Sequence, residues 1–195
     1  MGDLADLLLA RGQAAAAERL ALDGLGIQRR AFGARHPNVA DYQRILVSVY
    51  MRAGRFADAE RVQRESIDIL EQSLVPRHTV YAGALGALAE ILIERGRFDE
   101  AIAARHQNIA IRRQLFGERS AIYGIDLSRL ARLYARKHDF AVADSLFRVA
   151  LANQRQFAPD THFDVRAILG LMSERYRLEG NQVEAARYAR LAQPR

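Results

Sequence analysis

Two pairs of acidic residues come nearest to a catalytic arrangement in this sequence: Asp58 with Glu60, and Asp99 with Glu100. Neighbouring carboxylates can share the work of a general acid and a general base. Both pairs, however, directly follow a turn and fall in the first turn of an expected helix, where the helix dipole favours negative charge. No phosphate-binding glycine loop, zinc-ligand spacing or nucleophile motif accompanies them. We therefore expect a non-catalytic protein that uses no cofactor.

Three histidines could be considered as metal ligands. His36, His78 and His162 each lie 24 residues after a turn position that recurs along the chain. At least one whole repeat separates each from the next, so they cannot easily meet around one metal ion. We expect them to cap helix N-termini or to pack in loops, and we expect no metal site.

The positive charge of the chain is almost entirely guanidinium. The formal net charge of +6 comes from 29 basic and 23 acidic residues, and Lys137 is the only lysine. Most arginines alternate with Asp or Glu along expected helices, which favours a solvated face over a nucleic-acid surface. The alternative is nucleic-acid binding on a convex side rich in arginine, where the second helices of the repeats would gather Arg61, Arg64, Arg105, Arg112, Arg113, Arg148 and Arg155.

The sequence contains no cysteine, which excludes disulfides and thiolate chemistry. The apolar run from Leu7 to Ala10 is too short for a membrane span or a normal signal core, and acidic residues precede it. A cytoplasmic protein is the default expectation.

One pattern of apolar, small and turn residues recurs at a constant interval of 42 residues, with Gly12, Gly54, Gly96, His138 and Gly180 in equivalent places. Each repeat reads as two helices. In the second repeat, apolar residues at spacings of three and four predict one helix over 39–52 and another over about 55–74, ended by Pro76. The chain thus predicts one all-α solenoid domain over 1–195, with repeats at about 1–36, 37–78, 79–120, 121–162 and 163–195. The first helix of the first repeat is short.

Two columns of small residues explain how the paired helices approach each other. Small residues at a helix crossing permit close packing. One column stands seven residues before each turn and the other five residues after it; they contain Ala5, Val47, Ala89, Ala131 and Ser173, then Ala17, Ala59, Ala101, Ala143 and Ala185. A third column contains Tyr50, Tyr134 and Tyr176, for which core packing is favoured over ligand stacking.

His138 replaces glycine in the turn column. A turn of this kind often needs positive φ, which histidine tolerates less well than glycine. The substitution His138→Gly is therefore predicted to stabilise the protein by about 0.5 to 1 kcal/mol.

These residues resemble the tetratricopeptide repeat, a helix–turn–helix unit in which a small residue, a bulky residue, a glycine, an aromatic residue and an alanine recur, as at Ala89, Leu92, Gly96, Phe98 and Ala101. The 42-residue period resembles the kinesin-light-chain-like variety, with its Gly-x-x-His-Pro turn matched at 33–37. The resemblance implies a right-handed α-solenoid that acts as a protein–protein interaction scaffold. Its first helices line a concave groove for a partner peptide or helix.

The resemblance also implies, by register, which residues face the groove. The candidates are Arg44, Ser48, Met51, Arg52, Gly86, Glu90, Ile93, Glu94, Ser128, Arg132, Arg136, Glu174 and Arg177. Two interpretations of their charges stay open. Glu90 with Arg132, or Arg132 with Glu174, pair across adjacent repeats, which is slightly favoured; or the charges form a banded pattern that selects a partner. Gly83 and Gly86 either make room for a bulky partner side chain or allow close helix packing.

The sequence departs from the family where relatives often carry Leu-Asn-Asn-Leu-Ala, because residues 85–89 read Leu-Gly-Ala-Leu-Ala. The Lys and Asn residues that clamp two carboxylates in chaperone-binding relatives are missing too. A Glu-Glu-Val-Asp tail or a kinesin-style cargo peptide is therefore not expected as the ligand.

Only eleven residues precede Gly12. We therefore expect a fragment of a longer protein, or a chain that self-associates through the N-terminal end of the solenoid, where Leu4, Leu7 and Leu8 form an edge. Arrays of this variety are commonly attached to bacterial signalling proteins, including Ser/Thr kinases. The resemblance thus implies a regulatory or interaction part of such a protein.

Overall fold

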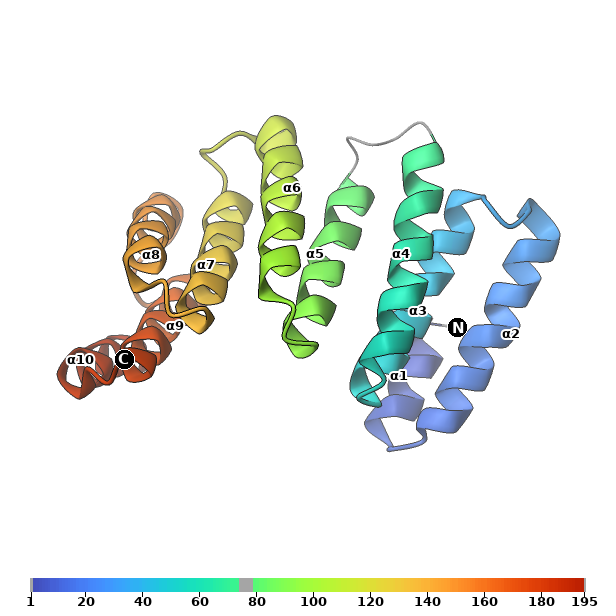
Figure 1. The fold of residues 1–195 in the computed structure, drawn as a ribbon, viewed down its shortest axis with the longest axis horizontal. Coiled ribbons are helices and arrows are strands. Elements are labelled where there is room, and N and C mark those ends of the chain that lie inside the picture. Colours follow the sequence, from blue (N-terminus) through green and yellow to red (C-terminus); the bar gives the residue numbers. More distant parts are fainter. Residues whose placement is uncertain (1, 74–78, 195) are drawn as a thin grey trace. The chain divides into compact units, whose positions relative to one another are not determined.

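The computed structural model describes residues 2–73 and 79–194. In these ranges the chain forms ten α-helices and no strand (Figure 1). The helices are α1 (Gly2–Ala10), α2 (Ala14–Phe32), α3 (Pro37–Arg52), α4 (Phe56–Gln72), α5 (Thr79–Glu94), α6 (Phe98–Phe116), α7 (Ala121–Arg136), α8 (Phe140–Gln154), α9 (Phe163–Glu179) and α10 (Gln182–Leu191). The all-α prediction is confirmed, including the short first helix. None of the described helices is both long and apolar enough to cross a membrane.

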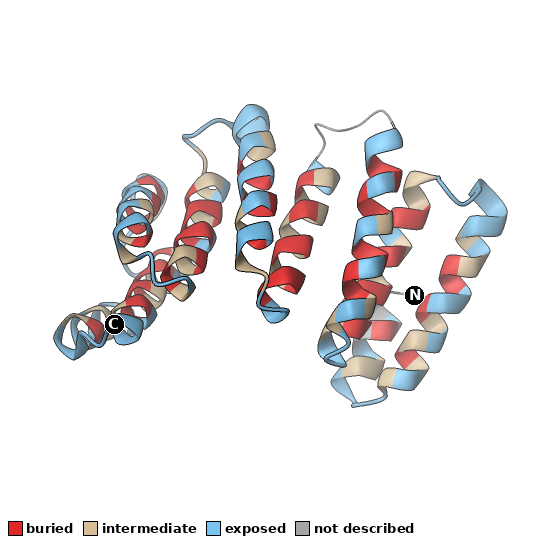
Figure 2. Cartoon of the chain, viewed as in Figure 1, coloured by how far each residue is buried: buried red, intermediate tan, exposed pale blue. Residues whose placement is uncertain are grey.

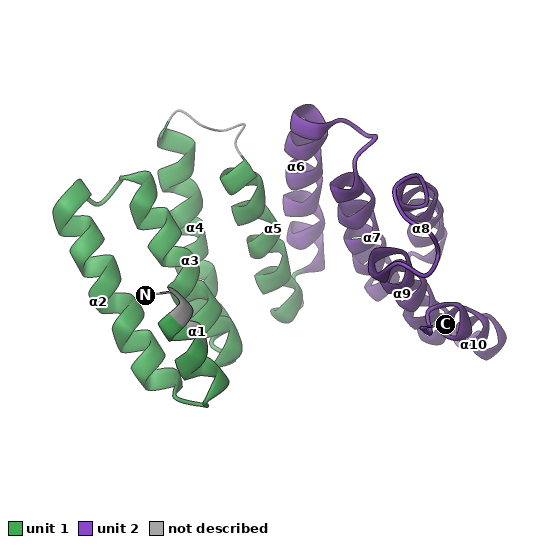
Figure 3. Ribbon diagram, turned by 180° about the vertical axis from the view of Figure 1, so that it is seen from behind, with its two compact units in different colours: residues 1–97 green, residues 98–195 purple. Residues whose placement is uncertain are grey.

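The chain divides into two compact units, residues 1–97 and 98–195 (Figure 3). In the first unit α1 packs on α2 and α3 on α4, and each second helix also contacts the next first helix, as α2 does with α3 and α4 with α5. The second unit repeats this arrangement from α6 to α10. Consecutive helix pairs are the arrangement expected of a solenoid.

The turns between paired helices share one backbone geometry. Gly54, Gly96 and His138 have φ values of 70°, 71° and 63°, in the left-handed region. At the first of these turns the N–H of Gly54 donates to the Met51 carbonyl at 3.2 Å, and the N–H of Arg55 donates to the Tyr50 carbonyl at 2.9 Å. The same two bonds recur around Gly96 and His138. The predicted positive φ in the turn column is therefore confirmed, and His138 is the described non-glycine residue that adopts it.

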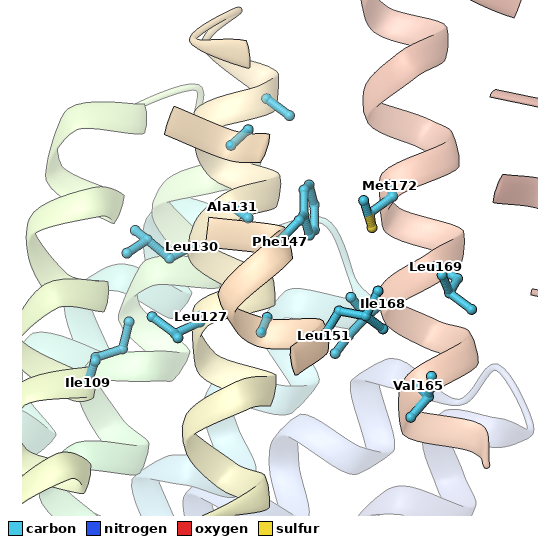
Figure 4. Close-up of a cluster of buried hydrophobic side chains, with 13 residues drawn as sticks. Ile109, Leu127, Leu130, Ala131, Phe147, Leu151, Val165, Ile168, Leu169 and Met172 are labelled. Atoms are coloured by element: carbon cyan, nitrogen blue, oxygen red, sulfur yellow. The ribbon is translucent and has the colours of Figure 1, made fainter. Parts of the chain in front are cut away.

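Figure 2 shows the buried residues of the helices in red. Both predicted columns of small residues are among the buried residues. Ala17, Ala59, Ala101 and Ala143 are fully buried, and Val47 is the most exposed member of either column at 5%. Each unit also has an apolar core of its own. Leu46, Tyr50 and Val62 belong to the core of the first unit, while that of the second is built around Phe147, Leu130 and Ile168 (Figure 4).

Individual hydrogen bonds set two helix ends. Helix α8 ends at Gln154, because the following N–H groups of Gln156 and Phe157 donate to carbonyls three residues back, which tightens the chain into a turn. The His162 side chain caps the N-terminus of α9. Leu4, which the sequence places at the N-terminal edge, is 49% exposed. The predicted end of the fourth helix near Leu74 and Pro76 lies outside the described residues.

Candidate functional site

The groove residues predicted on α3 lie on its surface or at its edge. Arg44 and Arg52 are exposed, while Ser48 and Met51 are half-buried. Neither arginine side chain forms an ion pair or a hydrogen bond with another described residue. Helix α3 therefore presents two free guanidinium groups to solvent.

On α5 the predicted residues differ in exposure. Gly86 and Glu90 are half-buried and Glu94 is exposed. Ile93 is only 7% exposed, so it belongs to the packed interior and is not available as a surface contact.

The second unit contributes the remaining predicted residues from α7 and α9. Arg132 and Arg136 are half-buried, and Glu174 and Arg177 are exposed. Ser128 is buried, and its hydroxyl donates to the Ile125 carbonyl at 2.7 Å, which corrects the prediction that it faces a partner. The Arg136 guanidinium lies over the Phe98 ring, 5.4 Å from its centroid.

The predicted pairing across adjacent repeats does not occur in this unit, because no ion pair joins Arg132 to Glu174 among the described residues. The pairing of Glu90 with Arg132 stays a prediction.

A pocket of about 260 Å³ opens between α3, α4 and α5 in the first unit. Its lining includes Asp41 and Arg44 of α3, Gln63 of α4, and Gly83, Ala84 and Ala87 of α5. A side chain added at Gly83 would meet no atom within 4 Å of its Cβ, which favours open room over close helix packing, the two interpretations of Gly83 that the sequence left open. Gln63, Ala84 and Ala87 were not singled out from the sequence. The signal that could have found them is their small or polar type at positions where the sequence two repeats further on carries Phe147, Ile168 and Leu171.

Polar groups mark one side of this pocket. Asp41 and Arg44 lie one helical turn apart, both exposed, and Asp41 likewise has no bonded partner among the described side chains. The Gln63 amide is already used, since its Nε2 donates to the Ala84 carbonyl at 3.0 Å. The pocket can receive an apolar group. At its rim, Asp41 and Arg44 can pair with charged groups of opposite sign. It holds no pair of groups arranged for proton transfer.

The acidic pairs that resembled a catalytic arrangement are engaged in ion pairs. The buried Glu60 carboxylate accepts hydrogen bonds from Arg64 and Arg97, both at 2.8 Å, and from Arg95. Burial raises the pKa of the Glu60 carboxyl, but these hydrogen bonds outweigh burial and leave its pKa below the usual 4.5. Lys137 donates to Asp99. A carboxylate held in its charged form by three arginines is a poor general acid, so a structural role accounts for Glu60.

One of these contacts recurs between successive repeats. Arg55, the residue after the Gly54 turn, donates to Glu18 on α2 at 2.7 Å. Arg97, the residue after the Gly96 turn, donates to Glu60 on α4 in the same way. Each turn is thereby tied to the second helix of the preceding repeat.

The histidines act as predicted where the structure describes them. The Nδ1 atom of His36 accepts from the Asn38 N–H at 3.2 Å, and Nδ1 of His162 accepts from the Asp164 N–H at 3.3 Å. Both therefore cap the N-termini of their helices. His78 lies outside the described residues. The described residues contain no group of three or more side chains that could hold a metal ion.

Tyr50 is buried, which favours its predicted role in core packing, and the Arg55 guanidinium lies 4.4 Å from its ring centroid. In the second unit the rings of Tyr176 and Tyr188 stack at 5.3 Å. The two rings pack against each other, so packing within the protein accounts for this stack without an external ligand.

The arginines proposed for a nucleic-acid surface are largely occupied. Arg105 is buried, and Arg64 is bound to Glu60. The other ion pairs of this set join Arg61 to Asp58, Arg112 to Asp126, Arg113 to Glu118 and Arg155 to Asp160. Paired guanidinium groups have less charge to offer phosphates, which removes the main argument for a nucleic-acid surface.

Consecutive antiparallel helix pairs, joined by left-handed turns and packed through small residues, define an α-helical repeat protein. The model of the tetratricopeptide repeat matches residues 1–72 and 80–156. The chain belongs to the tetratricopeptide repeat family, whose domains are typically protein-interaction scaffolds and generally non-catalytic.

Solved structures show the same fold. The nearly identical TPR-like repeats of a kinesin light chain from Podosopora anserina are 21% identical, with a TM-score of 0.84, over 98% of this chain and 90% of that chain. BtubC (BKLC) from P. vanneervenii is 21% identical, with a TM-score of 0.83, over 97% of this chain and 75% of that chain. MamA is 17% identical, with a TM-score of 0.62, over 96% and 91%. No curated protein matches the sequence.

Proposed function

We propose that the protein is a non-catalytic scaffold that binds a peptide or helix of another protein along its first helices. The observation that carries this proposal is the concentration of unused polar groups on α3. Arg44, Arg52 and Asp41 are exposed there without partners, beside an open pocket. Ion-paired side chains dominate the second helices, as at Glu60 and Arg112. Free charges beside a cavity are what a partner can use for specificity.

The proposed contact set follows from exposure in the structure. It contains the predicted residues whose side chains or backbone reach the surface, namely Arg44, Ser48, Met51, Arg52, Gly86, Glu90, Glu94, Arg132, Arg136, Glu174 and Arg177. Ile93 and Ser128 are left out because they are buried. Asp41 and Gly83 are added because they line the pocket.

The test is affinity capture from the native cell with the full chain, followed by binding of each purified candidate partner. The groove variants Arg44→Glu and Arg132→Glu are compared with Arg148→Glu, which alters an exposed arginine on the second helix α8. We expect a partner that the wild type and Arg148→Glu retain and that a groove variant loses. Equal retention by all variants would contradict groove binding. Retardation of duplex or single-stranded nucleic acid at low salt would revive the alternative function.

The finer assignment to a bacterial signalling protein rests on the kinesin-light-chain-like period of 42 residues alone. Reading the coding sequence upstream of Met1 tests it, because a kinase or another signalling domain in the same frame is the expected finding.

A further inference from the structure

One face of α8 is exposed to solvent and carries no charged residue. Its members are Val142, Ser145, Val149 and Ala152. All four are exposed, and the two valine residues keep 37% and 49% of their surface accessible. The opposite face of α8 packs into the core of the second unit through Phe147 and Leu151 (Figure 4). Helix α8 is therefore buried on one side and presents an uncovered apolar strip, the α8 stripe, on the other.

The repeat architecture does not require apolar residues at these positions. Two repeats earlier, the same positions of α4 are Asp58, Arg61, Glu65 and Asp68. There Asp58 pairs with Arg61 at 3.7 Å, and Glu65 pairs with Arg29. A charged, solvated face is thus compatible with this fold, so the packing of the repeat does not explain the α8 stripe. Contiguous apolar surface of this kind gains free energy when a partner covers it.

The spacing of the α8 stripe indicates what kind of partner fits it. Its successive residues are three, four and three positions apart, which is the a and d pattern of a helix that packs lengthwise against another helix. The two valines occupy a, and the small residues Ser145 and Ala152 occupy d. Small side chains let two helices approach closely and leave room for large apolar side chains from the second helix. The stripe therefore fits an amphipathic helix with leucine-sized residues along its seam.

The charge beside the stripe narrows the choice of helix. Arg148 is exposed and lies within one helical turn of Ser145 and Ala152. It forms no ion pair with a residue that the structure describes, and its Nε donates to the Asp144 carbonyl of its own helix at 3.4 Å. The Asp144 carboxylate is held by Arg175 at 2.8 Å. An arginine without an ion pair at this flank favours a partner with carboxylates at the matching flank.

A second copy of this chain fits the same flank poorly. In an antiparallel pairing of two α8 helices, equivalent flanking positions meet, so each Arg148 would face the Arg148 of the other copy. Like charges placed opposite each other disfavour a pairing. Arg155, the next arginine along this flank, is already bound to Asp160 at 2.7 and 2.8 Å. Charge therefore favours an acidic helix of another protein over a copy of this chain.

We propose that the α8 stripe is a second binding surface, which receives an amphipathic helix of another protein with large apolar residues along its seam and Asp or Glu beside them, where Arg148 pairs. This surface goes beyond the proposed function, because α8 is a second helix of its repeat and the proposed groove is formed by first helices. Two surfaces of this kind let one scaffold hold two partners.

The test selects helices from a phage-displayed library against the full chain. Library members carry leucine at a and d, and their flanking positions are randomised among Glu, Gln and Lys. We expect the enriched helices to carry Glu at one flank, and fluorescence polarisation measures the affinities of the corresponding peptides. Val142→Asp and Val149→Glu introduce the residues that α4 carries at the same positions, and each should weaken binding at least tenfold. Arg148→Glu should weaken binding of Glu-flanked helices at least tenfold and favour Lys-flanked ones.

Two matched variants make the same kinds of change away from the stripe. Gln107→Glu adds a glutamate at the exposed position of α6 that is equivalent to Val149, and Arg119→Glu reverses an exposed arginine in the loop before α7. Both should leave the affinity unchanged. Circular dichroism checks that every variant is folded.

Four outcomes would overturn the inference. Enriched helices that bind wild type and the two valine variants equally would place the binding elsewhere, and a selection without any enriched helix would show that the stripe takes no such partner. Equal affinity for Glu-flanked and Lys-flanked helices would remove the role of Arg148. Sedimentation equilibrium tests the other occupant, since a wild-type dimer that Val149→Glu dissociates would show that a second copy covers the stripe. None of these outcomes concerns the groove, so the proposed function would stand in each case.

Discussion

At the scale of single residues, Gln43 is a polar side chain in an apolar position of the core. It is fully buried on α3, and neither its Nε2 nor its Oε1 has a hydrogen-bond partner. The equivalent residues of the later repeats are Leu85, Leu127 and Leu169, all buried. A buried polar group without partners costs about 1 to 3 kcal/mol. We therefore expect Gln43→Leu to raise the free energy of unfolding by about 1 to 3 kcal/mol, measured by urea denaturation. Leu127→Gln is the reverse control and should lower it; a loss of stability in Gln43→Leu would contradict the argument.

The His138 turn shows how a neighbour changes a prediction made from one position. Its φ of 63° is confirmed, which supports a gain of about 0.5 to 1 kcal/mol from His138→Gly. The His138 ring, however, packs edge-on against Phe140 at 5.5 Å, a contact worth about 0.5 to 1.5 kcal/mol that glycine cannot make. We therefore expect His138→Gly alone to change the free energy of unfolding little or not at all. In a Phe140→Leu background, the same substitution should raise it by about 0.5 to 1 kcal/mol. Chemical denaturation of both backgrounds measures the difference, and equal effects in the two would show that the ring contact contributes nothing.

At the scale of elements, the Glu60 network joins α4 to the end of α5. The folded-state pKa of Glu60 lies below the usual 4.5, so its contribution to stability is fully present above about pH 4.5 and is lost as the pH falls through the folded-state pKa. We expect Glu60→Gln to lower the free energy of unfolding by about 1 to 2 kcal/mol at pH 7, because the three arginines are each about a third or more exposed and partly screened. The difference from wild type should shrink as the pH falls below 4.5. Denaturation midpoints between pH 3 and pH 7 provide the measurement.

The control is Glu65→Gln, which removes an ion pair with Arg29 whose two side chains are both about 40% exposed. It should cost less than about 1 kcal/mol at pH 7. Equal free energies of unfolding for Glu60→Gln and Glu65→Gln at neutral pH would contradict the argument that the Glu60 network stabilises the protein more than an exposed ion pair does.

The elements themselves could be read from the sequence because every repeat carries the same turn and the same small residues. Gly54 and Ala59 mark the pair of α3 and α4 as reliably as Gly180 and Ala185 mark the pair of α9 and α10. Helix ends were less predictable, since they depend on individual bonds such as those that the N–H groups of Gln156 and Phe157 donate in the turn after α8. The groove residues could be assigned only by register, and register does not distinguish Ser128, whose hydroxyl bonds within its own helix, from Arg44, which faces a pocket. The pocket exists because side chains on both α4 and α5 are small or polar, so the residue pattern of a single helix does not predict it.

At the scale of the whole molecule, each of the two units has an apolar core of its own. The core of residues 98–195 centres on Leu130, Phe147 and Ile168, and that of residues 1–97 on Leu46, Tyr50 and Val62. In repeat proteins stability is roughly a sum of local and nearest-neighbour contributions, so opening need not spread along the entire chain. The 42-residue period supplies equivalent residues in both units, which allows one substitution to be made in each core.

Leu46 and Leu130 occupy the same column of the repeat, and both are 2% exposed. Truncation of a buried leucine to alanine costs about 2 to 5 kcal/mol through lost burial and the cavity left behind. Because each leucine packs in the core of its own unit, Leu130→Ala should lower amide hydrogen-exchange protection mainly in α7, α8 and α9, and Leu46→Ala mainly in α2, α3 and α4. The two variants serve as controls for each other, since they make the same chemical change. An equal fall of protection over all described helices in both variants would show instead that the chain opens as one cooperative unit.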